Sequence, residues 1–275
     1  MVTMQNDYER MEYTGERMVP EGADYMTFWE HVHRYQFAAR FVDNKHVLDI
    51  ACGEGYGTAA LAKAGAVRVI GMDISEEACE HARRKYGVDC FAGNAENIPL
   101  ADKSIDLIVS FETIEHLEGP MAFLDECVRV LAPGGTLIIS TPNKEVNSEA
   151  GHYNQFHNFE VSEEEFKAML NPRFSSLALY TQRSVMAPWW SIRSFAAYSK
   201  PWDRIRGAGR LRNMIVEASC PHIVGEVNSA YRMKVVDKVL ENPPSMAKLV
   251  NPFIVRKRLI WGDEQACYYI AIAHL

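Results

Sequence analysis

The sequence of 275 residues has little that would suggest a membrane-spanning, secreted or nucleic-acid-binding protein. No apolar run reaches the length of a bilayer span, and Asp7, Glu9 and Arg10 do not resemble a signal peptide. Acidic residues outnumber basic ones, 36 to 29, so no positive net charge attracts nucleic acid. Internal repeats and low-complexity tracts are also absent from the sequence.

Cysteine pairs of the kind that bind metals or form redox motifs are missing too. The six cysteines stand at positions 52, 79, 90, 127, 220 and 267, with no C-x-x-C pair. This scatter predicts free thiols in a reducing compartment, and we expect a cytoplasmic protein. The hydrophobic content of 48% suffices for one full core with a sizeable insertion.

A glycine-rich turn is the most informative stretch that is present. Residues 46–57 read His-Val-Leu-Asp-Ile-Ala-Cys-Gly-Glu-Gly-Tyr-Gly. Residues 47–51 have the length and apolarity of a buried strand, the glycines break it, and residues 58–64 favour a helix. Such a turn places backbone N–H groups beside the strand end, where glycine lets a ligand come close. A tight turn that binds nothing is the alternative.

The spacing of the glycines separates two kinds of cofactor. Nicotinamide dinucleotide sites use G-x-G-x-x-G. Here Gly53, Gly55 and Gly57 are spaced G-x-G-x-G, with Asp49 four residues before the first glycine. This arrangement resembles motif I of the class I S-adenosylmethionine (SAM) methyltransferases. The resemblance implies that SAM is the cofactor and that Asp49, Gly53 and Gly55 belong to its site.

Residues further along stand at positions that fit the same family. Asp73 ends an apolar stretch twenty residues after the first glycine, where a carboxylate can accept hydrogen bonds from both ribose hydroxyls. The alternative is that Asp73 only caps the following helix. Asn94 and Ala95 stand where the family usually has Asp-Ala, and the amide oxygen of Asn94 can still accept from the adenine amine. Phe111 follows the buried strand 104–110, and we expect it against the adenine or the sulfonium.

The segment before the glycine turn carries a second resemblance. Residues 14–20 and 30–35 (Thr-Gly-Glu-Arg-Met-Val-Pro and Glu-His-Val-His-Arg-Tyr) resemble the amino-terminal part of bacterial methyltransferases found among glycan-assembly enzymes. Related SAM enzymes keep an arginine near this distance from the turn, so the resemblance implies that Arg34 grips the cofactor carboxylate. The alternative is an exposed arginine on an amphipathic helix over residues 29–41.

Two glutamates and two histidines form a candidate metal site. Glu112, Glu115 and His116 are spaced i, i+3 and i+4, which would place them on one helical turn, and His157 follows later. The pattern resembles the ubiquinone-pathway O-methyltransferases and the small-RNA 3′-end 2′-O-methyltransferases. The resemblance implies a divalent ion, Mg²⁺, Mn²⁺, Zn²⁺ or Fe²⁺, that holds the acceptor oxygen. Without a metal, His116 is a general base or a wall of the substrate pocket. In catalysis we expect His116, His157 and Glu112.

The order of the predicted elements gives a fold class and domain limits. Strand-like stretches near residues 47, 69, 90, 107 and 138 mostly alternate with helical ones, which predicts a Rossmann-like, doubly wound α/β sheet. Residues 175–182 and 266–273 would close it as a seven-stranded sheet. The expected parts are an arm and helix over the cofactor (1–45), a SAM-binding core (46–182), an inserted substrate cap (183–262) and a final core strand (263–275).

The predicted cap mixes basic and aromatic residues. Six basic residues lie between positions 193 and 212 against Asp203 alone, interleaved with aromatic side chains. They could form a local core with solvated charges, a pocket for an anionic acceptor, or a surface that lies on anionic lipid.

The sequence thus indicates a cytoplasmic SAM-dependent O-methyltransferase. The resemblance implies a hydroxyl of a sugar or glycan, or of a small hydroxylated metabolite or natural product, as the acceptor. Two alternatives remain. An RNA 2′-O-methyltransferase is disfavoured by the acidic charge balance. A non-catalytic SAM-binding partner of glycan-assembly enzymes would not need the glutamate and histidine set.

Overall fold

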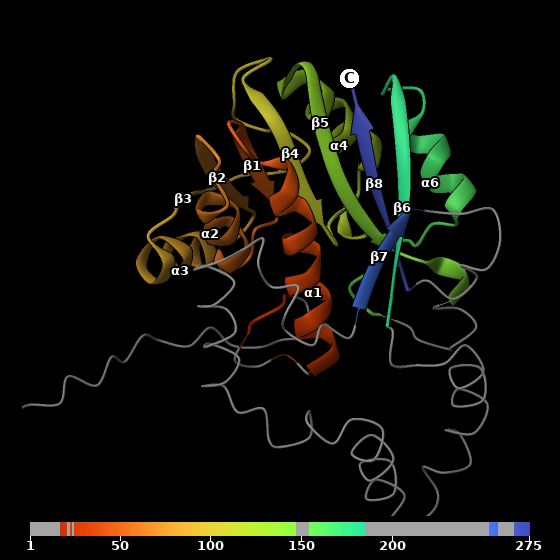
Figure 1. The fold of residues 1–275 in the computed structure, drawn as a ribbon, viewed down its shortest axis with the longest axis horizontal. Helices are drawn as coiled ribbons and strands as arrows, with labels where there is room; N and C mark the ends of the chain where they lie inside the picture. The colour runs from red at the N-terminus through yellow and green to blue at the C-terminus, as the bar shows by residue number, and fades with distance from the viewer. Residues whose placement is uncertain (1–16, 21–22, 24, 147–153, 185–252, 258–266) are drawn as a thin grey trace, which may run out of the picture.

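The computed structural model describes residues 17–20, 23, 25–146, 154–184, 253–257 and 267–275. Their strands form one mixed sheet in the order β3-β2-β1-β4-β5-β8-β6-β7 (Figure 1). Five strands run parallel: β1 (His46–Ile50), β2 (Arg68–Asp73), β3 (Asp89–Ala92), β4 (Ile105–Phe111) and β5 (Leu131–Pro142). Three more complete the sheet by antiparallel pairing: β6 (Ser176–Ser184), β7 (Phe253–Lys257) and β8 (Tyr268–His274).

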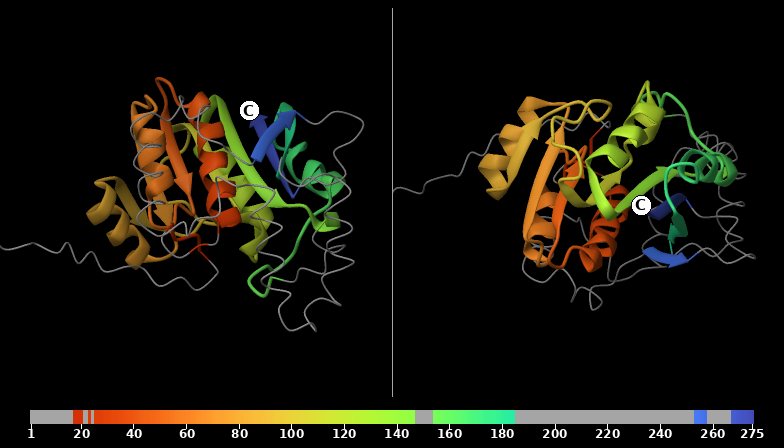
Figure 2. Two further views of the ribbon diagram at one scale, coloured as in Figure 1. Left: turned by 60° about the horizontal axis from the view of Figure 1, so that its bottom comes forward. Right: turned by 90° about the horizontal axis from the view of Figure 1, so that it is seen from above.

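Helices cover both faces of the sheet (Figures 1 and 2). They are α1 (Tyr25–Ala38), α2 (Tyr56–Lys63), α3 (Glu76–Tyr86), α4 (Pro120–Val130) and α6 (Glu163–Leu170), with short 3₁₀ turns η1 (Ala39–Phe41) and η2 (Ile114–His116). The Ser75 hydroxyl caps α3, and Ser162 with Glu165 forms a capping box on α6. None of these helices is both long and apolar enough to cross a membrane.

Two apolar cores result from the alternation of side chains along each buried strand. Val47 lies in the core under α1 and α2, whereas its neighbours Leu48 and Ile50 lie in the core under α4 and α6. A parallel strand that is covered on both faces therefore reads as a continuous apolar run. The strand order reverses between β1 and β4, and ligands of open α/β sheets bind at the carboxyl ends beside such a point.

The predicted fold class is confirmed, including the closing strand pair, which corresponds to β6 and β8. The seven predicted strands are β1–β6 and β8, and Phe253–Lys257 adds an eighth at the edge of the sheet by pairing with β6. This strand falls inside the range predicted for the cap, and so does the end of β6. The basic and aromatic stretch 193–212 lies outside the described residues, and the domain limits stay a prediction.

Candidate cofactor and acceptor site

The glycine turn at the end of β1 is held by close packing against two helices. Gly53 and Gly55 have φ of +57° and +92°, a region that favours glycine. A Cβ on Gly55 would lie 2.4 Å from the Cβ of Ala82, and one on Gly57 would lie 2.1 Å from the Tyr35 ring. The second and third glycines therefore let α2 approach α3 and α1. The cofactor role predicted for Gly53 and Gly55 stays a prediction.

Asp49 lies in β1 below this turn and is fully buried. Its carboxylate accepts hydrogen bonds from Thr58 Oγ1 (2.7 Å) and from the Tyr35 hydroxyl (3.1 Å). Burial raises the pKa of Asp49 to about 7, although both hydrogen bonds act in the opposite direction. Asp49 thus ties the strand to α1 and α2. Its predicted part in the cofactor site stays a prediction.

Asp73 ends β2 as predicted and is only 5% exposed. Its Oδ2 accepts from the backbone N–H of Gly53 (2.9 Å), and its Oδ1 accepts from the backbone N–H of Ser75 (3.0 Å). Arg17, which the sequence analysis did not single out, donates from Nη2 to the same Oδ1 (3.2 Å). The carboxylate is therefore fixed beside the glycine turn. This position suits both predicted roles of Asp73, which are to cap the following helix and to accept hydrogen bonds from the ribose.

The segment predicted for adenine recognition lies next to Asp73, because the N–H of Gly93 donates to the Asp73 carbonyl (2.9 Å). Asn94 is exposed and its Oδ1 accepts from the N–H of Glu96 (2.8 Å), while Ala95 is buried. An amide oxygen has two lone pairs, so Asn94 can accept a further hydrogen bond. Directly after Asp73, Ile74 is 73% exposed. A large exposed apolar residue at a strand end suits a planar apolar ligand. Ile74 was not predicted as a site residue, although its place directly after Asp73 could have indicated it.

Phe111 is buried at the end of β4 and packs against α1. Its ring makes an edge contact with the ring of Tyr35, with centroids 5.2 Å apart and an interplanar angle of 81°. The ring therefore belongs to the core under α1. Its predicted contact with the adenine or the sulfonium stays a prediction.

Arg34 occupies the centre of a buried polar network, so the alternative of an exposed arginine is wrong. Its Nη1 donates to Gln182 Oε1 (3.0 Å) and lies 3.8 Å from Glu112 Oε1. The guanidinium also lies over the Tyr268 ring, 4.5 Å from its centroid. Its Nε and Nη2 have no hydrogen-bond partner among the residues that the structure describes. Two buried donors without an acceptor fit a bound carboxylate.

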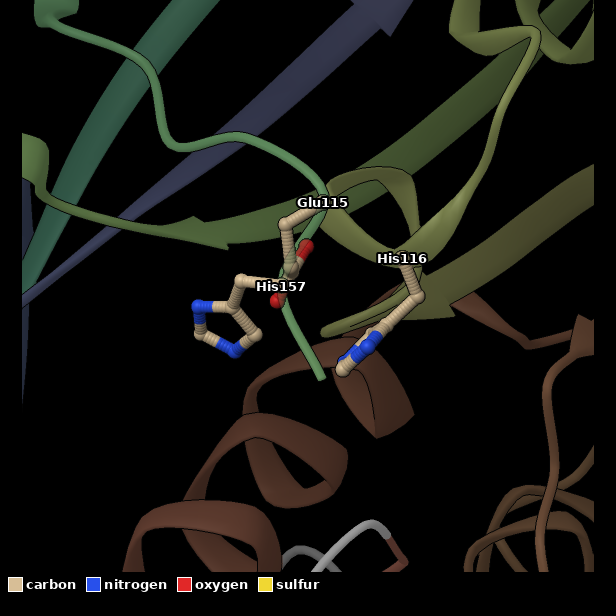
Figure 3. Close-up of side chains that lie close together, drawn as sticks. All are labelled: Glu115, His116 and His157. Carbon is tan, nitrogen blue, oxygen red and sulfur yellow. The ribbon is translucent and has the colours of Figure 1, made fainter. Parts of the chain in front are cut away.

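Three of the four predicted metal ligands come together. One ligand atom each of Glu115, His116 and His157 lies within 4.8 Å of the others (Figure 3). Glu115 is fully buried, and burial together with the charge of Glu112 raises its pKa well above the usual range. Its Oε2 accepts from Thr141 (3.4 Å), and Oε1 has no partner in the described part of the chain.

The predicted single helical turn is wrong for Glu112. The residue precedes η2 and has a φ of +53°, so it does not share a helical face with Glu115 and His116. Its Oε1 accepts from the Ser140 hydroxyl (2.7 Å) and faces Arg34. The structure therefore joins Glu112 to the arginine network and the other three residues to each other.

The two histidine rings are oriented by their own contacts. They meet edge to face with centroids 5.0 Å apart. His116 Nδ1 contacts the Phe156 carbonyl (2.8 Å), which places a proton on Nδ1 and a lone pair on Nε2. His157 contacts Glu160 Oε1 through Nδ1 (2.8 Å) and Asn154 through Nε2 (2.9 Å). A carboxylate on the other ring nitrogen is the usual support of a metal-binding histidine.

Asn158 links the two histidine segments and was not predicted. Its backbone N–H donates to the Glu115 carbonyl (2.8 Å), and its side chain donates to the His116 carbonyl (2.7 Å). This contact keeps the His157 segment beside η2. In the sequence, only the position of Asn158 directly after His157 could have indicated this role.

Fold and site together are typical of Rossmann-like nucleoside-binding proteins, since a glycine turn and an acidic strand end meet at the switch point of the sheet. Residues 48–139 match the methyltransferase domain family. This match, together with relatives that are named SAM-dependent methyltransferases, identifies residues 48–139 as a methyltransferase domain of the class I SAM-dependent type. The predicted resemblance is thus confirmed for this domain, and the domain family supports SAM as the cofactor.

The similarity to curated relatives extends over only part of the chain. The chain is 40% identical over 162 residues to a probable S-adenosylmethionine-dependent methyltransferase of Mycolicibacterium smegmatis. This alignment covers 57% of this chain and 62% of the relative. Over 118 residues the chain is 36% identical to a ubiquinone biosynthesis O-methyltransferase of Parvibaculum lavamentivorans, 41% of this chain and 46% of the relative. The chain thus spans less than two thirds of the length of these curated relatives.

A solved structure shows the same fold over most of the chain. It is a SAM-dependent methyltransferase of Thermotoga maritima, with a TM-score of 0.55, 18% identity, and coverage of 91% of this chain and 92% of the other. At this identity the likeness speaks for the fold alone.

Proposed function

We propose that the chain transfers the methyl group of SAM to a hydroxyl oxygen of an acceptor. The observation that carries this proposal is the pair of buried donors on Arg34 that have no partner among the described residues, at the ligand-binding edge of the sheet. A buried arginine that lacks acceptors is costly unless a ligand supplies them. The carboxylate of SAM has the charge and the two oxygens that this site requires.

The other proposed cofactor contacts follow from the geometry around Asp73. Its carboxylate would accept from the ribose hydroxyls, while Ile74 and Ala95 flank the adenine and Asn94 accepts from its amine. SAM, when bound, supplies the reactive methyl group and its own leaving group. The chain's part is to align an acceptor oxygen with that methyl group and to remove its proton.

His116 is the proposed base for the acceptor hydroxyl. The Phe156 carbonyl holds the proton on Nδ1, so Nε2 carries the lone pair that can take a proton. The Glu112 carboxylate accepts a hydrogen bond from the Ser140 hydroxyl and lies 3.8 Å from Arg34 Nη1. We therefore propose that it orients the donors around the methionine end of SAM.

A divalent ion is the second proposal for this site, and the grouping of Glu115, His116 and His157 supports it. The three donors, one oxygen and two nitrogens, suit Zn²⁺ or Fe²⁺ and accommodate Mn²⁺ or Mg²⁺. A cation held there would lower the pKa of an acceptor hydroxyl. Glu160 would support His157 from its second ring nitrogen.

The acceptor is proposed to be a sugar or glycan hydroxyl, or a small hydroxylated metabolite. This proposal is supported by the resemblance of residues 14–20 and 30–35 to glycan-cluster methyltransferases. The preference for oxygen is supported by the 36% identity to an enzyme named as an O-methyltransferase. An anionic acceptor and the cap limits 183–262 remain part of this proposal.

Incubation with methyl-labelled SAM and a panel of nucleotide sugars, glycans, polyphenols and RNA tests the proposal. We expect label on a hydroxyl of a sugar or phenol, and loss of transfer in Arg34→Met. Arg40→Met is the matched control, because Arg40 is exposed at the end of the same helical region. Binding of S-adenosylhomocysteine (SAH) without transfer to any acceptor would support a non-catalytic SAM-binding partner instead.

A further inference from the structure

Gln182 is a fully buried amide near the end of β6, and both ends of its side chain are used. Its Nε2 donates to the backbone carbonyl of Glu30 (3.0 Å), and its Oε1 accepts from Arg34 Nη1 (3.0 Å). Because a carbonyl can only accept, the Glu30 contact determines which end of the amide faces Arg34. The buried amide of Gln182 is thus oriented by the backbone of α1.

The contacts of Arg34 leave one particular edge of its guanidinium open. Tyr268 lies under the plane, and Gln182 holds Nη1, which Glu112 also approaches. The nitrogens without partners in the described structure are Nε and Nη2. These two lie side by side and form the fork that accepts a carboxylate with two parallel hydrogen bonds.

We propose that Gln182 is a positioning residue for the amino-acid end of the cofactor. By holding Nη1 it turns the fork of Nε and Nη2 toward the carboxylate, and so the site distinguishes ligands that carry the methionine part from truncated nucleosides. This inference rests on the proposed function, because it concerns the same cofactor site. It adds a contact from β6, 148 positions away from Arg34 in the sequence.

A merely structural role for Gln182, as a link between α1 and β6, predicts a different result. Such a link would affect every ligand of the folded protein equally. A positioning role affects only ligands with a carboxylate. SAH and 5′-methylthioadenosine separate the two roles, because both contain the adenosine and the sulfur, and only SAH has the amino acid group.

Isothermal titration of the full chain with both ligands is the experiment. In Gln182→Met, which removes the amide contacts to Arg34, the Glu30 carbonyl and His33 at similar volume, we expect SAH to bind at least tenfold more weakly, a typical loss for a charge-assisted contact. Affinity for 5′-methylthioadenosine should stay within twofold. Gln182→Asn, which keeps an amide but withdraws it by one methylene group, should show the same selective loss if Gln182→Met does not fold.

Thr181→Val is the matched control, because Thr181 is the buried neighbour on β6 and no contact joins it to Arg34 in the described structure. It should leave both affinities unchanged. Equal losses for both ligands, or no loss of SAH affinity, would overturn the positioning role. If the wild-type chain binds neither ligand, the proposed function itself fails, and the two failures are thus distinguishable.

Discussion

Arg17 Nη2 lies 3.2 Å from Asp73 Oδ1, and this ion pair joins the segment before α1 to the end of β2. The side chain of Arg17 also covers the glycine turn, since a Cβ on Gly53 would meet its Cγ at 3.4 Å. Asp73 is the residue proposed to accept from the ribose. Arg17 therefore competes with the ribose for one oxygen of this carboxylate.

Arg17→Ala should tighten SAH binding by up to about fivefold. The pair is partly exposed at Arg17, and pairs of this kind contribute at most about 1 kcal/mol. Calorimetric titration measures the change. Arg68→Ala, which removes an exposed pair with Asp89, is the control and should change nothing. Weaker SAH binding by Arg17→Ala would mean that Arg17 contacts the cofactor directly.

Gly55→Ala should destabilise the protein more than Gly87→Ala. Both glycines have positive φ, +92° and +66°, so alanine costs roughly 1–2 kcal/mol at each. Only at Gly55 would the new Cβ collide with α3, at Ala82, whereas at Gly87 nothing lies within 4 Å. Urea unfolding should show an additional loss of about 1–3 kcal/mol for Gly55→Ala. Equal losses would contradict the packing described for the turn.

Asp49→Asn should flatten the pH dependence of stability. The pKa of Asp49 is about 7 in the folded protein against an ordinary value of 3.8, so the folded state keeps a proton that the unfolded state loses. The free energy of unfolding should therefore fall as the pH rises from about 4 to 7, by up to about 4 kcal/mol from this group. Asparagine cannot ionise, so Asp49→Asn removes this contribution to the pH dependence of stability.

Urea unfolding of both proteins at pH 5 and pH 8 measures the difference. The wild type should lose more stability between these values than Asp49→Asn. Equal losses in the two proteins would show that Asp49 titrates near its ordinary value.

Turnover should depend on a divalent ion if the second proposal for the acceptor site holds. A chelator should abolish methyl transfer, and Mg²⁺, Mn²⁺ or Zn²⁺ should restore it. His157→Ala and Glu115→Gln should weaken metal binding strongly, and Glu112→Gln less, because Glu112 is not grouped with the other three. His46→Ala, an exposed histidine at the start of β1, serves as the control. Full activity in excess chelator, with no metal in elemental analysis, would leave His116 as the base.

Much of the fold could be predicted from the sequence because local features determine it. The glycine turn, the acidic end of β2 and the buried strands follow from short-range spacing and apolar runs. Glu112 shows where such reasoning fails. Its spacing suggested a helical turn, but its left-handed backbone and the Ser140 contact redirect the side chain. Spacing alone does not determine where a helix begins.

The surroundings of Arg34 could not be predicted for a different reason. Its burial depends on Gln182 and Tyr268, which arrive from strands far along the chain. The sequence contains no local signal that pairs these residues with α1. The eighth strand was missed likewise, because Phe253–Lys257 is recognisable as a strand only from its pairing with β6.

The central claim, a SAM site built on the glycine turn, Asp73 and Arg34, is tested most directly by titrating the purified chain with SAH and with NAD. We expect SAH to bind and NAD not to bind, because the glycine spacing is G-x-G-x-G. Asp73→Ala should weaken SAH binding by about tenfold or more, a loss typical of hydrogen bonds to a charged group. A wild-type chain that does not bind SAH, or an Asp73→Ala variant with undiminished SAH affinity, would contradict the account.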